Sequence, residues 1–455
     1  MGQASTGRNC RRGLRVGRAE PGPTLTIIEK NRWRHTAPEI RLSSSRPGRE
    51  LAARYDVGSR KLLRRPMFSH RTNWPLHPNA FTRAFAEVRA SGQEIFDLTV
   101  SNPTEAGVRP DHEIVLSALA NPEVMHYDPQ PLGLLEARKA VCHYYRESHD
   151  VFDLDPERLV LTTSTSEAYS YVFRLLCNAG DEILVPKPTY PLFEFLADLS
   201  DVKLVPYPLI YDHGWQIDFD SLYKAATPHT RAVIVVHPNN PTGSYASASE
   251  SSALNAFCND YNLALIVDEV FLDYAHDGAL RPSFVANASA LTFTLSGISK
   301  ISALPQMKLS WVVTSGPQEL VAQAGARLEI IADTFLSMNA PVQLAAPVLL
   351  DQRKQVQPVL LNRLRVNLAE LDRQLASTPS CTRFQVEGGW YAVLRVPAVQ
   401  SDEELAIALL RKKAVVVHPG HFYDFPSDGH LVLSLITEPK VFREGVSRLL
   451  EIIGR

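Results

Sequence analysis

Three polar motifs in this chain of 455 residues each follow an apolar run about as long as a single strand. H-P-N-N-P-T-G at 237–243 follows A-V-I-V-V, Asp268 follows L-A-L-I-V, and Lys300 comes shortly after A-L-T-F-T-L. Short apolar runs bounded by polar residues are typical of buried strands. Open α/β sheets bind ligands at the carboxyl ends of their strands. We therefore expect the three motifs to lie close together at one edge of a sheet.

The segments around these runs alternate between strand and helix patterns. Further strand-type runs occupy 159–163, 290–295 and 309–314, and apolar residues recur at helical spacing over 132–147. Another helix is expected to begin at Ser164, because serine is favoured at helix N-termini. Alternating strands and helices favour a mostly parallel central sheet with helices on both faces. The predicted fold class is therefore α/β.

The pattern changes after about residue 345. A long charged amphipathic helix is expected over 355–376, followed by strand-type runs at 388–396 and 431–436. These elements indicate a second, smaller α/β unit. The domains that we predict are a large domain over 111–345, a smaller domain over 346–455, and an N-terminal segment over 67–110 that joins the smaller one.

Residues 1–66 differ from the rest of the chain in charge. They contain sixteen Lys and Arg against five Asp and Glu, a net charge of +11, whereas the remainder has 31 against 44, a net charge of −13. Glycine, serine and proline are scattered through this segment and apolar periodicity is weak, which predicts a disordered basic extension. A nucleic-acid-binding arm and a transit peptide are alternatives. We favour an upstream extension of the reading frame, with folding that begins near Met67.

The composition is typical of a globular protein. Apolar residues make up 45% of the chain and charged residues 21%. No apolar run approaches the roughly 20 residues that a membrane helix needs. The five cysteines are widely spaced, and no pair has the spacing of metal ligands. We therefore expect a cytoplasmic protein with no metal site, no membrane association and no nucleic-acid partner.

The residue types at the strand ends indicate a particular cofactor. A lysine that can bind an aldehyde covalently and a carboxylate that can hold a pyridinium nitrogen are the minimum equipment for pyridoxal phosphate chemistry. Each motif also has a structural interpretation: Asp268 as a helix cap, Lys300 as a solvated charge and P-N-N-P-T-G as a turn. Their occurrence together in this order favours the chemical interpretation.

The ordered motifs N-P-T-G, D-x-x-aromatic and S-K resemble those of fold-type-I pyridoxal-phosphate enzymes, in particular the class I/II aminotransferases, over about residues 95–440. The resemblance implies that Lys300 carries the cofactor and acts as general base and acid, and that Asp268 faces the pyridine nitrogen. It also implies that Tyr127 reaches the phosphate of a neighbouring subunit. The other cofactor-binding residues implied by the resemblance are Ser164, Thr165, Ser166, Tyr190, Asn240, Phe271, Ser299 and Lys308.

Four positions depart from the pattern of this family, and one is Gly297, where a serine often stands three residues before the lysine. Lys308 stands where an arginine usually grips the phosphate, so it keeps the positive charge but lacks the bidentate fork. Phe271 replaces a tyrosine that in many members donates to a ring oxygen of the cofactor. Val432 stands where an arginine usually binds the substrate carboxylate. The possible replacements for that arginine are Arg395, His421 and Tyr423.

We predict an aminotransferase that moves an amino group from an amino acid or amine to an oxo acid by a ping-pong mechanism. The resemblance at Tyr127 implies a homodimer with shared active sites. Two alternatives stay open: a pyridoxal-phosphate lyase or decarboxylase on the same fold, and a regulator with an aminotransferase-like sensor domain.

Overall fold

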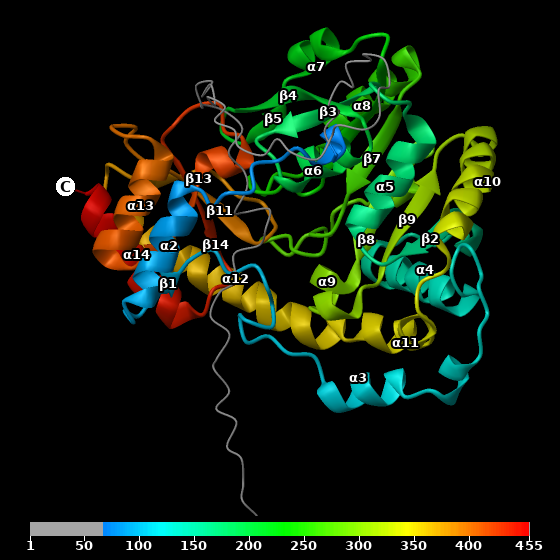
Figure 1. Cartoon of the computed structure of the whole chain (residues 1–455), viewed down its shortest axis with the longest axis horizontal. Coiled ribbons are helices and arrows are strands. Elements are labelled where there is room, and N and C mark those ends of the chain that lie inside the picture. The colour runs from blue at the N-terminus through cyan, green and yellow to red at the C-terminus, as the bar shows by residue number, and fades with distance from the viewer. Residues whose placement is uncertain (1–66, 455) are drawn as a thin grey trace, which may run out of the picture.

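The computed structural model describes residues 67–454, which form two lobes (Figure 1). The predicted basic extension over 1–66 lies outside the described residues. The α/β class is confirmed, because the larger lobe contains a mostly parallel central sheet flanked by helices. None of the helices in residues 67–454 is both long and apolar enough to cross a membrane.

The larger lobe is built on an eight-stranded sheet in the order β2-β9-β8-β7-β6-β3-β4-β5. Neighbouring strands from β8 to β4 in this order pair in parallel, and the remaining pairs are antiparallel. β9 reverses direction because only the short helix α9 (Ile298–Ile301) and a turn join it to β8, and a parallel crossover usually needs a full helix. The strands are β2 (Leu159–Thr162), β3 (Glu182–Lys187), β4 (Lys203–Tyr211), β5 (Trp215–Ile217), β6 (Thr230–Val236), β7 (Ala264–Asp268), β8 (Thr292–Gly297) and β9 (Ser310–Ser315).

Helices cover both faces of this sheet because its strands are apolar on both sides. Successive side chains of a strand point to opposite faces, so Ile234 and Ile266 pack with α5, α6 and α10, whereas Val233 and Leu265 pack with α7 and α8. The helices of this lobe are α3 (His112–Leu119), α4 (Leu135–His149), α5 (Thr165–Leu176), α6 (Leu192–Leu199), α7 (Phe219–Ala225), α8 (Ala248–Tyr261), α10 (Gln318–Phe335) and α11 (Ala340–Asp351).

The register of the parallel strands brings the predicted motifs to one edge. Val236 at the end of β6 pairs with Asp268 at the end of β7, and Asp268 pairs with Leu295 in β8. The loop that contains Asn240 therefore starts beside Asp268. Lys300 follows on α9, directly after β8. This is the arrangement predicted from the three strand-end motifs.

The smaller lobe contains a four-stranded sheet, β10-β11-β14-β13, and a two-stranded sheet, β1-β12. Its core joins distant parts of the chain, since Phe81 and Leu98 pack in the same cluster as Leu409 and Val446. The domain boundaries given above stay predictions. The elements of this lobe are α2 (Ala80–Ala90), β1 (Phe96–Asp97), α12 (Arg353–Leu375), β10 (Thr382–Arg383), β11 (Tyr391–Arg395), α13 (Asp402–Lys413), β12 (Val415–Val416), β13 (His418–Pro419), β14 (His430–Ser434) and α14 (Pro439–Ile453).

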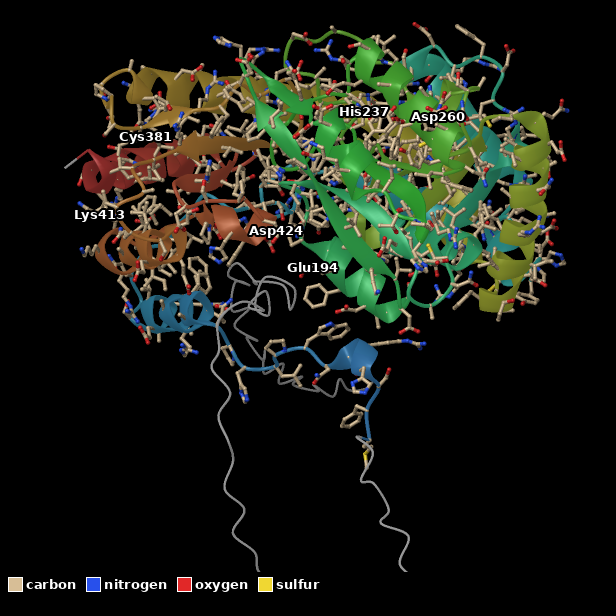
Figure 2. The ribbon with its side chains drawn as sticks, turned by 90° about the horizontal axis from the view of Figure 1, so that it is seen from above. Glu194, His237, Asp260, Cys381, Lys413 and Asp424 are labelled. Atoms are coloured by element: carbon tan, nitrogen blue, oxygen red, sulfur yellow. The ribbon has the colours of Figure 1, made fainter. Side chains whose placement is uncertain are left out.

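The two lobes are joined by hydrogen bonds close to the strand edge. The N–H of Gly388 donates to the carbonyl of Gly243 at 2.9 Å. Asp424 lies at the boundary between the lobes (Figure 2) and forms an ion pair with Lys187 at the end of β3. Short 3-10 turns complete the connections: η1 (His70–Thr72), η2 (Pro122–Met125), η3 (Pro156–Arg158), η4 (Phe284–Ala286), η5 (Pro305–Met307) and η6 (Gly420–Tyr423).

The contact at Gly388 leaves no room for a side chain. A Cβ atom there would lie 2.5 Å from the Tyr245 hydroxyl and 2.8 Å from the backbone oxygen of Tyr274. Gly388→Ala should therefore overpack the junction between the lobes and lower the free energy of unfolding by roughly 1–3 kcal/mol. Urea unfolding followed by circular dichroism measures this loss.

The matched control is Gly325→Ala on α10. A Cβ atom at Gly325 meets nothing within 4 Å, and alanine is the better helix former by roughly 0.5–1 kcal/mol. Gly325→Ala should therefore keep or raise the stability. Equal stabilities of the two variants would contradict the close packing at Gly388.

Candidate active site

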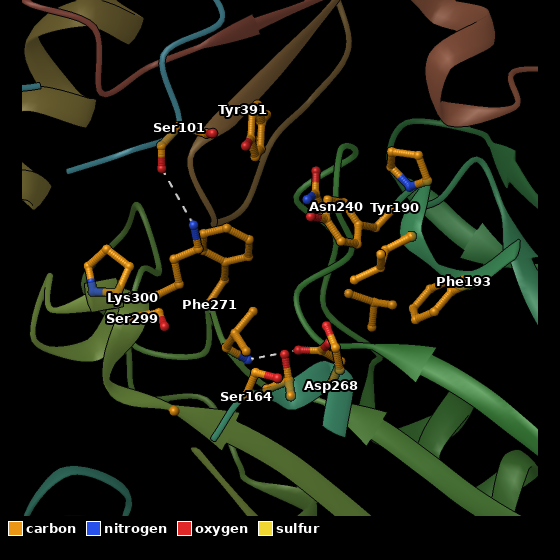
Figure 3. A pocket seen from close by; sticks show the side chains of 18 of the residues that line it. Ser101, Ser164, Tyr190, Phe193, Asn240, Asp268, Phe271, Ser299, Lys300 and Tyr391 are labelled. Carbon is orange, nitrogen blue, oxygen red and sulfur yellow. Dashed lines mark hydrogen bonds between the residues drawn. The ribbon is translucent and has the colours of Figure 1, made fainter. Parts of the chain in front are cut away.

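A cavity of about 320 Å³ lies beside the carboxyl ends of the parallel strands, where the smaller lobe faces the larger one (Figure 3). It collects side chains from both lobes and from segments far apart in the sequence. The predicted site residues that line it are Ser164, Thr165, Ser166, Tyr190, Asn240, Asp268, Phe271, Ser299, Lys300 and Tyr423.

The amine of Lys300 enters this cavity among aromatic rings. Its Nζ donates to the backbone oxygen of Ser101 at 3.5 Å (Figure 3). The same atom lies 4.7 Å from the ring centre of Trp390 and 5.5 Å from that of Phe271. Burial disfavours the charged amine and lowers the pKa of Lys300 to about 8, although the nearby Asp268 opposes the shift. A substantial fraction of the amine is therefore uncharged, the nucleophilic form, at mildly basic pH.

The carboxylate of Asp268 faces the same cavity from the end of β7. Burial raises the pKa of Asp268 to about 6. The Val270 N–H and the Tyr169 hydroxyl, which both donate to the carboxylate at 3.1 Å, oppose this increase, as does the charge of Lys300. The carboxyl group therefore stays mostly ionised at neutral pH and can hold a protonated ring nitrogen.

The N-terminus of α5 forms another wall of the cavity. Ser164 is the N-cap residue, and its side chain accepts from the Glu167 N–H at 3.2 Å. Thr165 and Ser166 begin the helix and also line the cavity. The first N–H groups of a helix and its dipole favour an anion, so this wall can hold a phosphate.

Asn240 provides a test of whether these residues fit pyridoxal phosphate. Its Oδ1 atom is buried and has no hydrogen-bond partner among the described residues. An unsatisfied buried polar atom is costly, so a polar ligand in the cavity would stabilise this side chain. With Lys300 for the aldehyde, Asp268 for the ring nitrogen and the start of α5 for the phosphate, the cavity fits this cofactor.

Four predicted residues lie outside the cavity lining. Lys308 is exposed, directly after η5, and Arg395 is exposed at the end of β11. His421 is partly buried in η6. Tyr127 is 73% exposed and borders a different cavity on the larger lobe. Their predicted roles stay predictions.

Val432, at the position where an arginine was expected, is fully buried in the middle of β14. It pairs with Val393 on β11 and with His418 on β13. Val432 itself does not line the cavity, whereas His418, directly opposite it on β13, does.

Several residues around the cavity were not identified from the sequence. Ser101, Tyr391 and His418 line it, and Tyr169 donates to Asp268. His418 follows the apolar run A-V-V-V, so the strand-end signal used for the other motifs indicates it too. No sequence signal identifies Tyr169, because its contact joins a helix to a strand 99 residues later in the chain.

Comparisons with known proteins agree with this geometry. The family model for aminotransferase class I and II matches residues 93–449. A glutamate-pyruvate aminotransferase (AlaA) of Haemophilus influenzae is 26% identical over 388 residues, which cover 84% of this chain and 94% of that protein. An alanine aminotransferase of Mycobacterium bovis is 27% identical over 384 residues, which cover 82% of this chain and 88% of that protein.

Solved structures share the same fold. An aminotransferase from Escherichia coli has a TM-score of 0.73 at 24% identity and covers 82% of this chain and 94% of its own. The N-succinyldiaminopimelate aminotransferase from Mycobacterium tuberculosis has a TM-score of 0.69 at 25% identity, with coverage of 82% and 96%. The predicted activity and cofactor are thereby confirmed. This chain belongs to the class I and II aminotransferases, enzymes that use pyridoxal phosphate to transfer amino groups.

Proposed function

We propose that Lys300 is the catalytic residue of this aminotransferase, that it binds the cofactor's aldehyde covalently, and that it moves the proton at the amine-bearing carbon of the substrate. One observation carries this proposal: two groups enter one cavity, the Asp268 carboxylate from the end of β7 and the Lys300 amine from α9, directly after the neighbouring strand β8. When bound, pyridoxal phosphate supplies a ring that withdraws electrons from the substrate carbon. Asp268 holds the nitrogen of that ring in its protonated form.

The remaining lining residues orient the cofactor in this proposal. Ser164, Thr165 and Ser166 bind the phosphate at the start of α5, where the helix dipole favours an anion. Asn240 meets the ring oxygen through its side-chain amide. Tyr190 covers one face of the ring, and its own ring is braced edge-on by Phe193 at 6.5 Å.

Phe271 leaves the ring oxygen without the hydroxyl that many relatives supply. Tyr274 does not replace it in this arrangement, because its hydroxyl donates to the backbone oxygen of Lys300 at 2.6 Å. We infer that Tyr274 positions the backbone of α9, while Asn240 is the main polar neighbour of the ring oxygen.

We further propose that two copies of the chain form a homodimer. Leu116, Met125 and Tyr127 expose 64%, 88% and 73% of their surface. Met125 and Tyr127 border a cavity of about 450 Å³ that Pro341 and Leu344 also line. An exposed apolar area of this kind is typical of a protein interface. The resemblance of Tyr127 to a tyrosine that works across the interface supports sharing of the active sites.

A cytoplasmic location completes the proposal. The cysteines in the described part of the chain, Cys142, Cys177, Cys258 and Cys381, are all free thiols. Unpaired thiols are typical of reducing compartments.

Lys300→Ala should remove both cofactor capture and transamination, because no other amine lines the cavity among the described residues. Borohydride reduction of the loaded enzyme followed by peptide mass spectrometry should place the cofactor on Lys300. Lys139→Ala, at an exposed lysine on α4, is the matched control and should keep the covalent attachment. Attachment to a different lysine in the wild-type enzyme would overturn the assignment.

The rate of cofactor capture by the apo-protein should depend on pH with a midpoint of about 8. The lowered pKa of Lys300 means that the reactive uncharged amine is the minor form below about 8 and the major form above it. The rate should rise about tenfold per pH unit at lower pH and level off above the midpoint. Stopped-flow absorbance with pyridoxal phosphate measures it, and a midpoint near the ordinary lysine value of about 10.4 would contradict the effect of burial.

The dimer should depend on the exposed apolar residues near α3. Light scattering of the wild-type protein should give the mass of two chains, and Met125→Asp should shift the population towards monomer because it buries an unpaired charge. Val399→Asp, at another highly exposed apolar residue on the smaller lobe, is the control and should leave the mass unchanged. A wild-type monomer with full activity would exclude shared active sites.

A further inference from the structure

The cavity contains few charged groups. Among the described residues that line it, Lys300 is the one Lys or Arg and Asp268 the one Asp or Glu. In the proposed function the cofactor engages both of these groups. A substrate carboxylate must therefore meet a different cation or donor, because an anion buried without a partner is strongly disfavoured.

His418 occupies the wall where such a donor is needed. Directly opposed residues of antiparallel strands share one face of the sheet, and the pairs are His418 with Val432 and Tyr391 with Ser434. Val432 and Ser434 lie two residues apart on β14, so all four side chains are on the same face. His418 and Tyr391 line the cavity, so this face is turned towards it. The imidazole thus stands beside the apolar Val432.

The ring of His418 is held in place by η6. Its Nδ1 atom is hydrogen-bonded to the Tyr423 hydroxyl at 3.1 Å, and the ring lies 5.7 Å from the ring of Phe422 and 5.9 Å from that of Tyr423. When the hydroxyl donates to Nδ1, the proton of a neutral imidazole is on Nε2, and a protonated imidazole carries protons on both nitrogens. With the Tyr423 hydroxyl as donor to Nδ1, a ligand that meets Nε2 is offered an N–H donor in both protonation states, and the present inference takes this arrangement.

The rest of this wall is aromatic. Tyr391, Phe422 and Tyr423 line the cavity on the side of the smaller lobe, and such rings favour apolar or aromatic groups of a ligand. No further cation lines this cavity in the described part of the chain that could pair with a second carboxylate.

We propose that His418, oriented by Tyr423, binds the carboxylate of 2-amino acids and 2-oxo acids that carry an apolar or aromatic side chain. The proposal rests on the proposed function and adds its substrate class. His418 is the binding residue, and Tyr423 is a positioning residue that acts through the imidazole. The aromatic wall contacts the side chain of the substrate.

The first experiment measures binding without turnover. The loaded enzyme is titrated with 3-phenylpropanoate and with its neutral analogue 3-phenylpropanamide by calorimetry. The wild type should bind the carboxylate more tightly than the amide. His418→Leu should weaken the binding of the carboxylate by about 10- to 100-fold, the range for a charge-assisted hydrogen bond. The affinity for the amide should stay nearly unchanged.

Two further variants test the geometry. His418→Gln keeps a side-chain N–H donor and should recover part of the affinity for the carboxylate. Tyr423→Phe should raise KM for phenylalanine but leave kcat nearly unchanged, since it loosens the imidazole without touching the reacting atoms. The control is His430→Leu, at a histidine outside the cavity lining on the same strand as Val432. It should leave the affinities for both ligands unchanged.

The second experiment compares amino donors. The value of kcat/KM should be at least about tenfold higher for phenylalanine or leucine than for glutamate or aspartate, because one histidine meets one carboxylate. A preference for dicarboxylic donors would overturn the substrate class. Unchanged affinities for the carboxylate in both His418→Leu and His418→Gln would overturn the role of His418.

These outcomes are distinct from a failure of the proposed function. If the wild-type enzyme transferred no amino group between any donor and oxo acid, or if Lys300→Ala stayed active, the proposed function would fail. If transfer depended on Lys300 while the carboxylate preference did not depend on His418, only the present inference would be lost.

Discussion

The parallel pairing of β6, β7 and β8 is the constraint on which the active site depends. It places the loop with Asn240, the carboxylate of Asp268 and the helix with Lys300 at one edge. Because side chains alternate along a strand, a slip of one residue would turn Asp268 to the opposite face of the sheet. The apolar clusters on both faces oppose such a slip, since a shifted strand would exchange the side chains that fill them. The packing that fixes the strand register therefore also fixes the positions of Asp268 and Lys300.

Burial then prepares these groups for reaction at a cost in stability. The pKa of Asp268 is raised to about 6 and that of Lys300 is lowered to about 8, so desolvation outweighs their mutual attraction in both residues. Perturbed groups of this kind gather at functional sites. Tyr169 and Val270 limit the penalty at Asp268 by donating to it. A ligand with a cationic ring nitrogen and an aldehyde would offset the remaining desolvation penalty of these two groups.

The sequence was sufficient for the fold class and for the lining residues that follow β6, β7 and β8, because those features depend on local patterns. Apolar runs followed by polar motifs located β6, β7 and β8 together with Asp268 and Lys300. Contacts that depend on three-dimensional packing could not be predicted from the sequence. Tyr169 meets Asp268 across a helix–sheet interface, and the position of His418 opposite Val432 depends on the pairing of β13 with β14. The exposed position of Arg395 likewise follows from the end of β11, which sequence spacing alone does not reveal.

The hydrogen bond from the Thr189 N–H to the Tyr423 carbonyl, at 2.9 Å, ties the two lobes together at the cavity. Thr189 precedes Tyr190, the residue proposed to cover the ring, while Tyr423 supports the imidazole of His418. The wall proposed for the cofactor and the wall proposed for the substrate thus share one backbone connection. Mutant libraries that vary η6 alone to change the donor preference are therefore expected to disturb cofactor binding as well. The loop that contains Thr189 and Tyr190 has to be varied together with η6.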